Sequence, residues 1–146
     1  MIPLNLPAFE YNVKNKDGKV LIFDVVRKKH VVLTPEEWVR QHFIHFMINH
    51  LQYPKSLIRI ESGLSYNSLK KRSDIVVYNR EGTPWMVVEC KAPDQQVDAR
   101  VMRQVSVYNT SLKAPYLAIT NGLRHICCAI DHPTQNVAIL DNFPSF

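Results

Sequence analysis

The sequence predicts a mixed α/β (α+β) domain in which two helices flank a central β-sheet. Short apolar segments bounded by Pro, Gly, Asn and Asp alternate with two segments in which apolar residues recur at helical spacing. The predicted order is a hairpin, a helix, three strands, a second helix, a strand and two closing strands. A chain of 146 residues can bury one core, so we expect a single domain over 1–146, with an arm and hairpin at 1–33 and a core at 34–146.

Composition narrows the class of protein. Hydrophobic residues make up 46% and charged residues 21%, which is typical of globular proteins in water. The sequence contains no run of 18 apolar residues and no secretory signal pattern at its start, so we expect a cytoplasmic protein without a membrane span. The formal charge of +5 favours contact with polyanions. Cys90, Cys127 and Cys128 lie in apolar segments, where we expect buried, reduced thiols.

Turn and cap residues place the expected elements. Asp17-Gly18 predicts a hairpin turn, and Thr34-Pro35-Glu36-Glu37 predicts a helix that starts with a capping box and runs to Leu51. The basic run 27–30 is either a solvated turn or an edge that faces phosphates. An extended arm is expected at 1–8, a second helix at 96–112, and strands at 9–13, 20–24, 31–33, 57–61, 115–120, 124–130 and 136–140.

The stretch from Arg72 to Pro93 carries the candidate chemistry. It predicts two strands that are apolar on both faces, and hence central in the sheet. With a loop at 79–84, Tyr78 pairs with Trp85 and Asp74 pairs with Glu89. Directly opposed residues have Cβ atoms roughly 4.5–5.5 Å apart, and carboxylates that close repel unless a cation lies between them. Lys91 shares a face with Glu89, and the set suits a hard divalent cation, above all magnesium.

This arrangement of residues resembles a known nuclease superfamily. An Asp on one strand and Glu-x-Lys on the next, within this element order, resemble the PD-(D/E)XK nucleases. The runs TPEEWVRQHF, RSDIVVYN and VVECKAP resemble the N-terminal nuclease domain of type I restriction enzyme R subunits, over roughly residues 20–145. The resemblance implies a restriction-endonuclease-like αβββαβ core, DNA as substrate, and Mg²⁺ as cofactor, with Mn²⁺ as a substitute.

The resemblance also implies roles for individual residues. Asp74 and Glu89 match the metal-binding acids, and Lys91 matches the catalytic lysine. The helix acid matches Glu36, with Glu37 as the alternative. The backbone carbonyl of Cys90 is a further candidate metal ligand. Gln104 and Tyr108 match a Gln-x-x-x-Tyr motif, which gives Gln104 a catalytic role and Tyr108 a nucleic-acid contact. Apart from the resemblance, the polar loop before Asp74 is either only a loop or a contact for substrate phosphates, for which the candidates are Lys70, Lys71 and Arg72.

Some features depart from the family or leave alternatives open. Ser73, not proline, precedes Asp74, and the four glycines cannot form an ATP-binding phosphate loop, so we expect no ATP-driven motor in this chain. Glu61 is either a surface residue or a further carboxylate at the site. Two functions remain: a metal-dependent DNA endonuclease, or a non-catalytic nucleic-acid-binding or assembly module. Besides DNA, the expected partners are other restriction-system subunits or a second copy of the chain.

Overall fold

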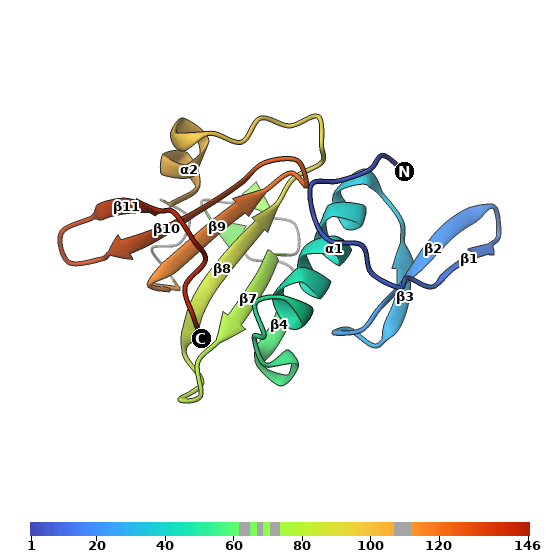
Figure 1. Ribbon diagram of the computed structural model, residues 1–146, viewed down its shortest axis with the longest axis horizontal. Helices are drawn as coiled ribbons and strands as arrows, with labels where there is room; N and C mark the ends of the chain where they lie inside the picture. The colour runs from blue at the N-terminus through green and yellow to red at the C-terminus, as the bar shows by residue number, and fades with distance from the viewer. Residues whose placement is uncertain (62–64, 67–68, 71–73, 107–111) are drawn as a thin grey trace.

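The computed structural model has a mixed six-stranded sheet with a smaller three-stranded sheet beside it (Figure 1). It describes residues 1–61, 65–66, 69–70, 74–106 and 112–146, without the side chains of Ser65, Tyr66, Leu69, Lys70, Asp74 and Gln104. The strand order of the large sheet is β11-β10-β9-β8-β7-β4, and its only parallel pair in the described residues is β8 with β9. The predicted mixed α/β class and nuclease-like order of elements are therefore present.

The described elements follow the expected order with small shifts in their bounds. The three-stranded sheet contains β1 (Val13–Lys16), β2 (Lys19–Asp24) and β3 (Lys29–Val32). The large sheet contains β4 (Ile58–Glu61), β7 (Asp74–Tyr78), β8 (Pro84–Cys90), β9 (Tyr116–Thr120), β10 (His125–Asp131) and β11 (Asn136–Leu140). The helices are α1 (Pro35–Asn49), the short η1 (Lys55–Leu57) and α2 (Ala99–Ser106). A short pair not expected from the sequence is β5 (Ser65–Tyr66) with β6 (Leu69–Lys70).

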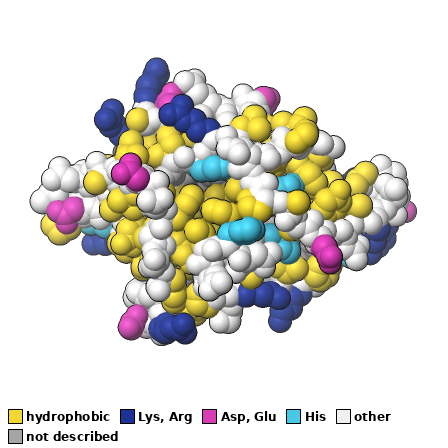
Figure 2. Space-filling view, viewed as in Figure 1, with side chains coloured by type: hydrophobic (Ala, Val, Ile, Leu, Met, Phe, Trp, Pro, Cys, Tyr) yellow, Lys and Arg dark blue, Asp and Glu magenta, His cyan; other side chains and the backbone are white. Residues whose placement is uncertain are grey.

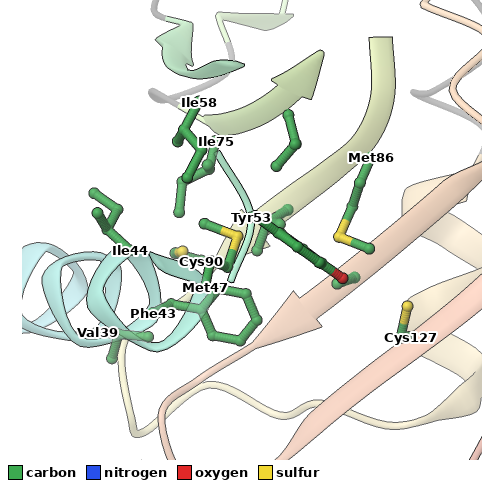
Figure 3. Packing of buried hydrophobic residues seen from close by; sticks show 13 residues of the cluster. Val39, Phe43, Ile44, Met47, Tyr53, Ile58, Ile75, Met86, Cys90 and Cys127 are labelled. Atoms are coloured by element: carbon green, nitrogen blue, oxygen red, sulfur yellow. The ribbon is translucent and has the colours of Figure 1, made fainter. Parts of the chain in front are cut away.

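Helix α1 starts where the sequence predicts and covers one face of the large sheet. The Oγ1 atom of Thr34 accepts a hydrogen bond from the backbone N of Glu37 at 3.0 Å, which satisfies an N–H group that the first turn leaves unpaired. The side chains of α1 and of the sheet then form one apolar layer (Figure 3). Members of this layer include Val39, Phe43, Ile44, Met47, Ile75, Met86 and Cys90. The helix ends at Asn49, two residues before the predicted end.

Helix α2 belongs to a second apolar layer. Val76 and Val87 pack with Met102 and Val105 of α2, whereas their strand neighbours pack in the α1 layer. Strands β7 and β8 are therefore apolar on both faces, as central strands are. The predicted start of this helix at residue 96 is wrong. Asp98 caps the helix instead, because its Oδ1 accepts a hydrogen bond from the backbone N of Val101 at 2.9 Å.

The turn of the N-terminal hairpin is at the predicted position, but the first strand of the hairpin begins later in the chain than predicted. Asp17 and Gly18 have φ angles of +52° and +77°, the conformation of a two-residue hairpin turn. This turn pairs Lys16 with Lys19, so β1 spans 13–16 and not the expected 9–13. Phe9 stacks on His45 of α1 instead, with ring centroids 4.2 Å apart.

The hairpin of β7 and β8 has the predicted register over three pairs. Ile75 pairs with Val88, and the next two pairs continue the same register. The predicted pair of Tyr78 with Trp85 is wrong, because a register shift after Val77 pairs Tyr78 with Pro84. The cause lies in the loop, where the Oδ1 of Asn79 accepts hydrogen bonds from two backbone N–H groups and tightens the turn by one residue.

The N-terminal arm is fixed across α1 and the turn after β9. The backbone N of Asn5 donates to the carbonyl of Gly122 at 2.7 Å, and the indole of Trp38 donates to the carbonyl of Ile2 at 2.9 Å. The three cysteines are buried free thiols, as predicted. Among the described residues, every helix is too short or too polar to cross a membrane.

Candidate active site

Glu89 and Lys91 lie together at the carboxyl end of β8. The Nζ of Lys91 is 3.5 Å from Oε1 of Glu89, and the two side chains are 26% and 16% exposed. Their shared face follows from the two-residue period of a strand. The backbone N of Lys91 donates to the carbonyl of Thr120 at 2.8 Å, so pairing with β9 holds this residue even beyond the last residue of β8.

The backbone of Asp74 begins the neighbouring strand. The ladder of β7 with β8 begins at the pair of Ile75 with Val88, so Asp74 and Glu89 are each the next residue beyond that pair. On its other side Asp74 pairs with Glu61 of β4. Three acidic positions on three adjacent strands therefore meet at one end of the sheet, and only the Asp74 side chain falls outside the described part.

Glu61 is half-buried and already has a partner. The hydroxyl of Tyr78 donates to its Oε1 at 2.7 Å. Burial, followed by this hydrogen bond and the charge of Glu61, raises the pKa of Tyr78 to about 12. Both alternatives for Glu61, a surface position and a role as a further carboxylate at the site, stay predictions.

Cys90 connects the end of β8 to α1. Its side chain is 4% exposed and lies in the α1 layer, on the face of β8 opposite to that of Glu89 (Figure 3). The Cys90 side chain is one of the groups that raise the pKa of the Arg40 guanidinium, which indicates that Arg40 of α1 is close to this end of β8. The first turns of α1 therefore lie beside the end of β8 where Glu89 and Lys91 stand.

Glu36, the candidate helix acid, is held by Arg40. Their ion pair is 2.9 Å long at i,i+4 spacing. Arg40 is itself 3% exposed, and it also binds Glu37 at 3.0 Å. Burial opposes the charge of Arg40, but Cys90, Glu37 and Glu36 together raise its pKa. Arg40 was not among the predicted site residues, although the spacing from Glu36 was visible in the sequence.

Glu37 has a different role from the one predicted. Its backbone takes part in the cap, but its carboxylate binds Arg27 at 2.8 Å, Arg40 at 3.0 Å and the side-chain amide of Gln41 at 3.0 Å. The reciprocal half of a capping box is therefore replaced by a buried polar network. Because these partners satisfy the carboxylate, Glu37 is explained by structure, and Glu36 remains the candidate acid.

Asp24 completes this network from the three-stranded sheet. Its carboxylate binds the Nε of Arg27 at 2.6 Å and the Nε2 of Gln41 at 3.0 Å, and it is fully buried. Burial opposes ionisation of Asp24, but hydrogen bonds from the backbone and side chain of Arg27 and from Gln41 lower its pKa below the ordinary value. Sequence reasoning missed this residue, because its partners are distant in the chain.

Several predicted contacts lie wholly or partly outside the described residues. Gln104 is on α2, but its side chain is not described. The backbone of Lys70 is in β6, again without its side chain. Lys71, Arg72 and Tyr108 lie outside the described residues altogether. Their roles stay predictions.

The donor set at this end of the sheet fits a hard cation. Glu89 offers carboxylate oxygens, and Cys90 offers a backbone carbonyl next to it in the chain. Oxygen donors of this kind suit Mg²⁺ better than a thiolate or imidazole site does. The described residues contain no group of three His, Cys, Asp or Glu side chains that could hold a metal. The Asp74 carboxylate is not among the described side chains.

Comparison with known proteins gives one finding. The family described as type I restriction enzyme R protein N terminus (HSDR_N) matches residues 35–144, which include α1, the β7–β8 hairpin, α2 and the closing strands. Neither the curated proteins nor the solved structures show a significant match. The match covers the positions of Asp74, Glu89, Lys91 and the candidate helix acid Glu36. Because it spans most of the sequence, the chain belongs to the family of type I restriction enzyme R protein N-terminal domains.

Proposed function

We propose that the chain is a metal-dependent DNA endonuclease that hydrolyses phosphodiester bonds. The observation that carries the proposal is the pair of Glu89 and Lys91, 3.5 Å apart at the end of β8, the strand that pairs with the strand begun by Asp74. Charged side chains at the end of strands that are apolar on both faces are costly unless they serve one another or a ligand. Membership of a restriction enzyme family supports a substrate that is DNA.

The proposed roles follow from the chemistry of each group. Asp74 and Glu89, with the carbonyl of Cys90 and the carboxylate of Glu36, would hold Mg²⁺. The bound ion would supply Lewis-acid polarisation of the scissile phosphate. Lys91 is a point charge with three N–H donors, and it orients the attacking water and stabilises the negative charge that develops on the phosphate. Glu89 fixes the Lys91 ammonium in place through their ion pair.

Arg40 has a positioning role in this proposal. It holds the carboxylate of Glu36 in an ion pair, and Cys90 at the end of β8 is among the groups that raise its pKa. Gln104 would add a polar group from α2. Lys70, Lys71, Arg72 and Tyr108 would contact the DNA, and other restriction-system subunits or a second copy of the chain are the further proposed partners.

A cleavage assay tests the proposal. Purified chain is incubated with single-stranded, duplex and branched DNA, with Mg²⁺ or Mn²⁺ or with EDTA. We expect cleavage with metal, none in EDTA, and none with Asp74→Ala or Glu89→Gln. Lys55→Gln, an exposed residue after α1, is the matched control and should cleave like the wild type.

Two outcomes would overturn the endonuclease. Cleavage at wild-type rates by both acid variants would show that the site is elsewhere. Salt-sensitive DNA binding by a wild type that never cuts under any metal would favour the non-catalytic module.

A further inference from the structure

We propose that the outward face of the three-stranded sheet β1–β2–β3 is a second DNA-binding surface that contacts the phosphate backbone of a duplex. The sheet, residues 13–32, is called the wing below. The inference rests on the proposed function, because DNA is its ligand. The wing precedes the family match, which begins at residue 35, so nothing in that match assigns it a role.

The register of the wing separates its two faces. Ile22 and Asp24 are fully buried, so their face of β2 lies against the rest of the molecule. Residues directly opposed in an antiparallel ladder share a face. Lys14 is opposed to Leu21 and Lys16 to Lys19, on the face away from Ile22. His30 and Val32 extend this outward face onto β3, opposite Phe23 and Leu21.

This outward face is basic. Its ionisable side chains in the strands are Lys14, Lys16, Lys19 and His30, and none of them is acidic. Within the part of the chain that the structure describes, none of the three lysines forms an ion pair. The wing contains six Lys or Arg and two Asp residues, a formal charge of +4 in a chain of +5. The wing therefore carries most of the net charge.

The opposed pair of Lys16 and Lys19 indicates an anionic ligand. Like charges directly opposite one another on a ladder destabilise it, and a bound phosphate would remove that repulsion. Protection of an exposed sheet edge is the other explanation for lysines in such a sheet. That explanation fits Lys14 and Lys16 on the edge strand β1, but it does not fit Lys19 on the central strand β2.

The wing is rigidly attached to the helix that borders the candidate active site. Asp24, at the end of β2, binds Gln41 of α1 at 3.0 Å, and Arg27, in the turn that follows, binds Glu37 of α1 at 2.8 Å. Buried charges in such a network are costly to separate. DNA bound on the wing would therefore be held in a fixed position relative to α1 and the Cys90 end of β8.

The shape and chemistry of the wing favour a duplex backbone. The hairpin of β1 and β2 projects from the end of the molecule opposite β11, and Lys and Arg side chains are visible at that end (Figures 1 and 2). Lysine is a point charge that contacts phosphates without reading bases. Proteins that bind single-stranded nucleic acid stack its bases on exposed aromatic side chains. The one phenyl ring on this face, that of Phe23, is half-buried and packs against His30, so the face favours a duplex.

The test compares two triple variants of equal charge loss. The wing variant is Lys14→Gln/Lys16→Gln/Lys19→Gln. The control is Lys55→Gln/Arg80→Gln/Lys113→Gln, three exposed residues that lie near the ends of α1, β7 and β9 away from Glu89. Binding of a labelled 30-base-pair duplex (about three helical turns) is measured by fluorescence anisotropy in EDTA, across a series of salt concentrations, and repeated with a single strand.

We expect the wing variant to lose duplex affinity by at least about tenfold at low salt, and its slope of log K against log salt to fall by roughly 0.9 for each lost contact. The control variant should keep the wild-type slope. Cleavage at saturating duplex should be unchanged in the wing variant, because the wing holds DNA and does not touch the reacting phosphate.

The outcomes separate this inference from the proposed function. If the wild type binds and cuts DNA but the wing variant has the slope of the control, the wing assignment is wrong and the endonuclease stands. The wing assignment would also be wrong if the wing variant lost affinity for the single strand but not for the duplex. If the wild type binds no DNA, both proposals fail. Should the triple variant not fold, Lys19→Gln alone, which relieves the repulsion with Lys16, tests the inference through a slope decrease of roughly 0.9, the value for one lost contact.

Discussion

Lys91 and Glu89 are two residues apart on one face of the chain at the carboxyl end of β8, and their charged atoms are 3.5 Å apart. An ion pair of this length is compatible with two roles for the lysine. As a structural counter-ion it would matter for folding, and as a catalytic group it would matter only when substrate is bound.

Lys91→Ala should separate these roles. Metal affinity should stay close to that of the wild type or increase, because a positive charge that competes for Glu89 is removed. Cleavage should fall by roughly a hundredfold or more, the scale seen when one electrostatic stabiliser is lost. Calorimetric titration with Mn²⁺ and a nuclease assay on the same preparation measure both, with Lys55→Ala as control. A variant that unfolds, or that cuts at the wild-type rate, would contradict the catalytic role.

Glu36 and Glu37 are adjacent in the sequence but should respond differently to loss of charge. Glu37 is 6% exposed and has three partners, so Glu37→Gln should lower the free energy of unfolding by about 1–3 kcal/mol. Glu36→Gln should cost less stability and abolish cleavage, if Glu36 is the helix acid. Urea denaturation and the nuclease assay decide between them. The reverse pattern would make Glu37 the functional acid.

Much of the fold could be predicted because its signals are local. The turn at Asp17-Gly18, the cap at Thr34 and the apolar strands around Ile75 and Val87 each depend on residues close in the chain. A two-residue period then fixes the pairing of Ile75 with Val88. Local patterns of this kind predict where helices and strands lie and how β7 and β8 pair. The same two-residue period predicts that Glu89 and Lys91 lie on one face.

What the sequence did not predict depends on side chains that are far apart in the chain. The contact of Asp24 with Gln41 joins two elements across 17 residues, and no spacing rule in the sequence encodes it. The register shift at Tyr78 depends on which backbone N–H groups Asn79 binds within the loop. Glu36 with Arg40 is the exception, since an i,i+4 pair can be found from the sequence.

The buried carboxylate of Asp24 should make stability depend on pH in the acid range. Its pKa in the folded state is lowered, so its contribution is present above the unfolded value of roughly 3.9 and is lost as pH falls through the folded value. Asp24→Asn should lower the free energy of unfolding by roughly 2 kcal/mol at pH 7 and flatten its dependence on pH below about 4. Denaturant titrations at several pH values measure this. Asp17→Asn, in the exposed hairpin turn, is the control, and an equal effect there would contradict the assignment.

Gly122 and Gly82 offer a matched pair for testing how firmly the N-terminal arm is packed. Their φ angles are +85° and +84°, so alanine is strained equally at both, by roughly 1 kcal/mol or more. A Cβ atom at Gly82 would meet nothing within 4 Å, whereas one at Gly122 would lie 2.7 Å from Cδ2 of Leu4 and 3.1 Å from Cγ2 of Val39. Gly122→Ala should therefore destabilise the protein by about 1–3 kcal/mol more than Gly82→Ala.

The close contact should also depend on the arm itself. In a Leu4→Ala background, most of the excess cost of Gly122→Ala should disappear, because the nearest atoms are gone. Thermal denaturation of the four variants and the wild type gives this coupling. If Gly122→Ala costs no more than Gly82→Ala, or if removing Leu4 leaves the excess unchanged, the arm is not packed against the turn after β9 in solution. Coupling between Leu4 and Gly122 would show that the arm belongs to the same folding unit as the sheet that carries Glu89.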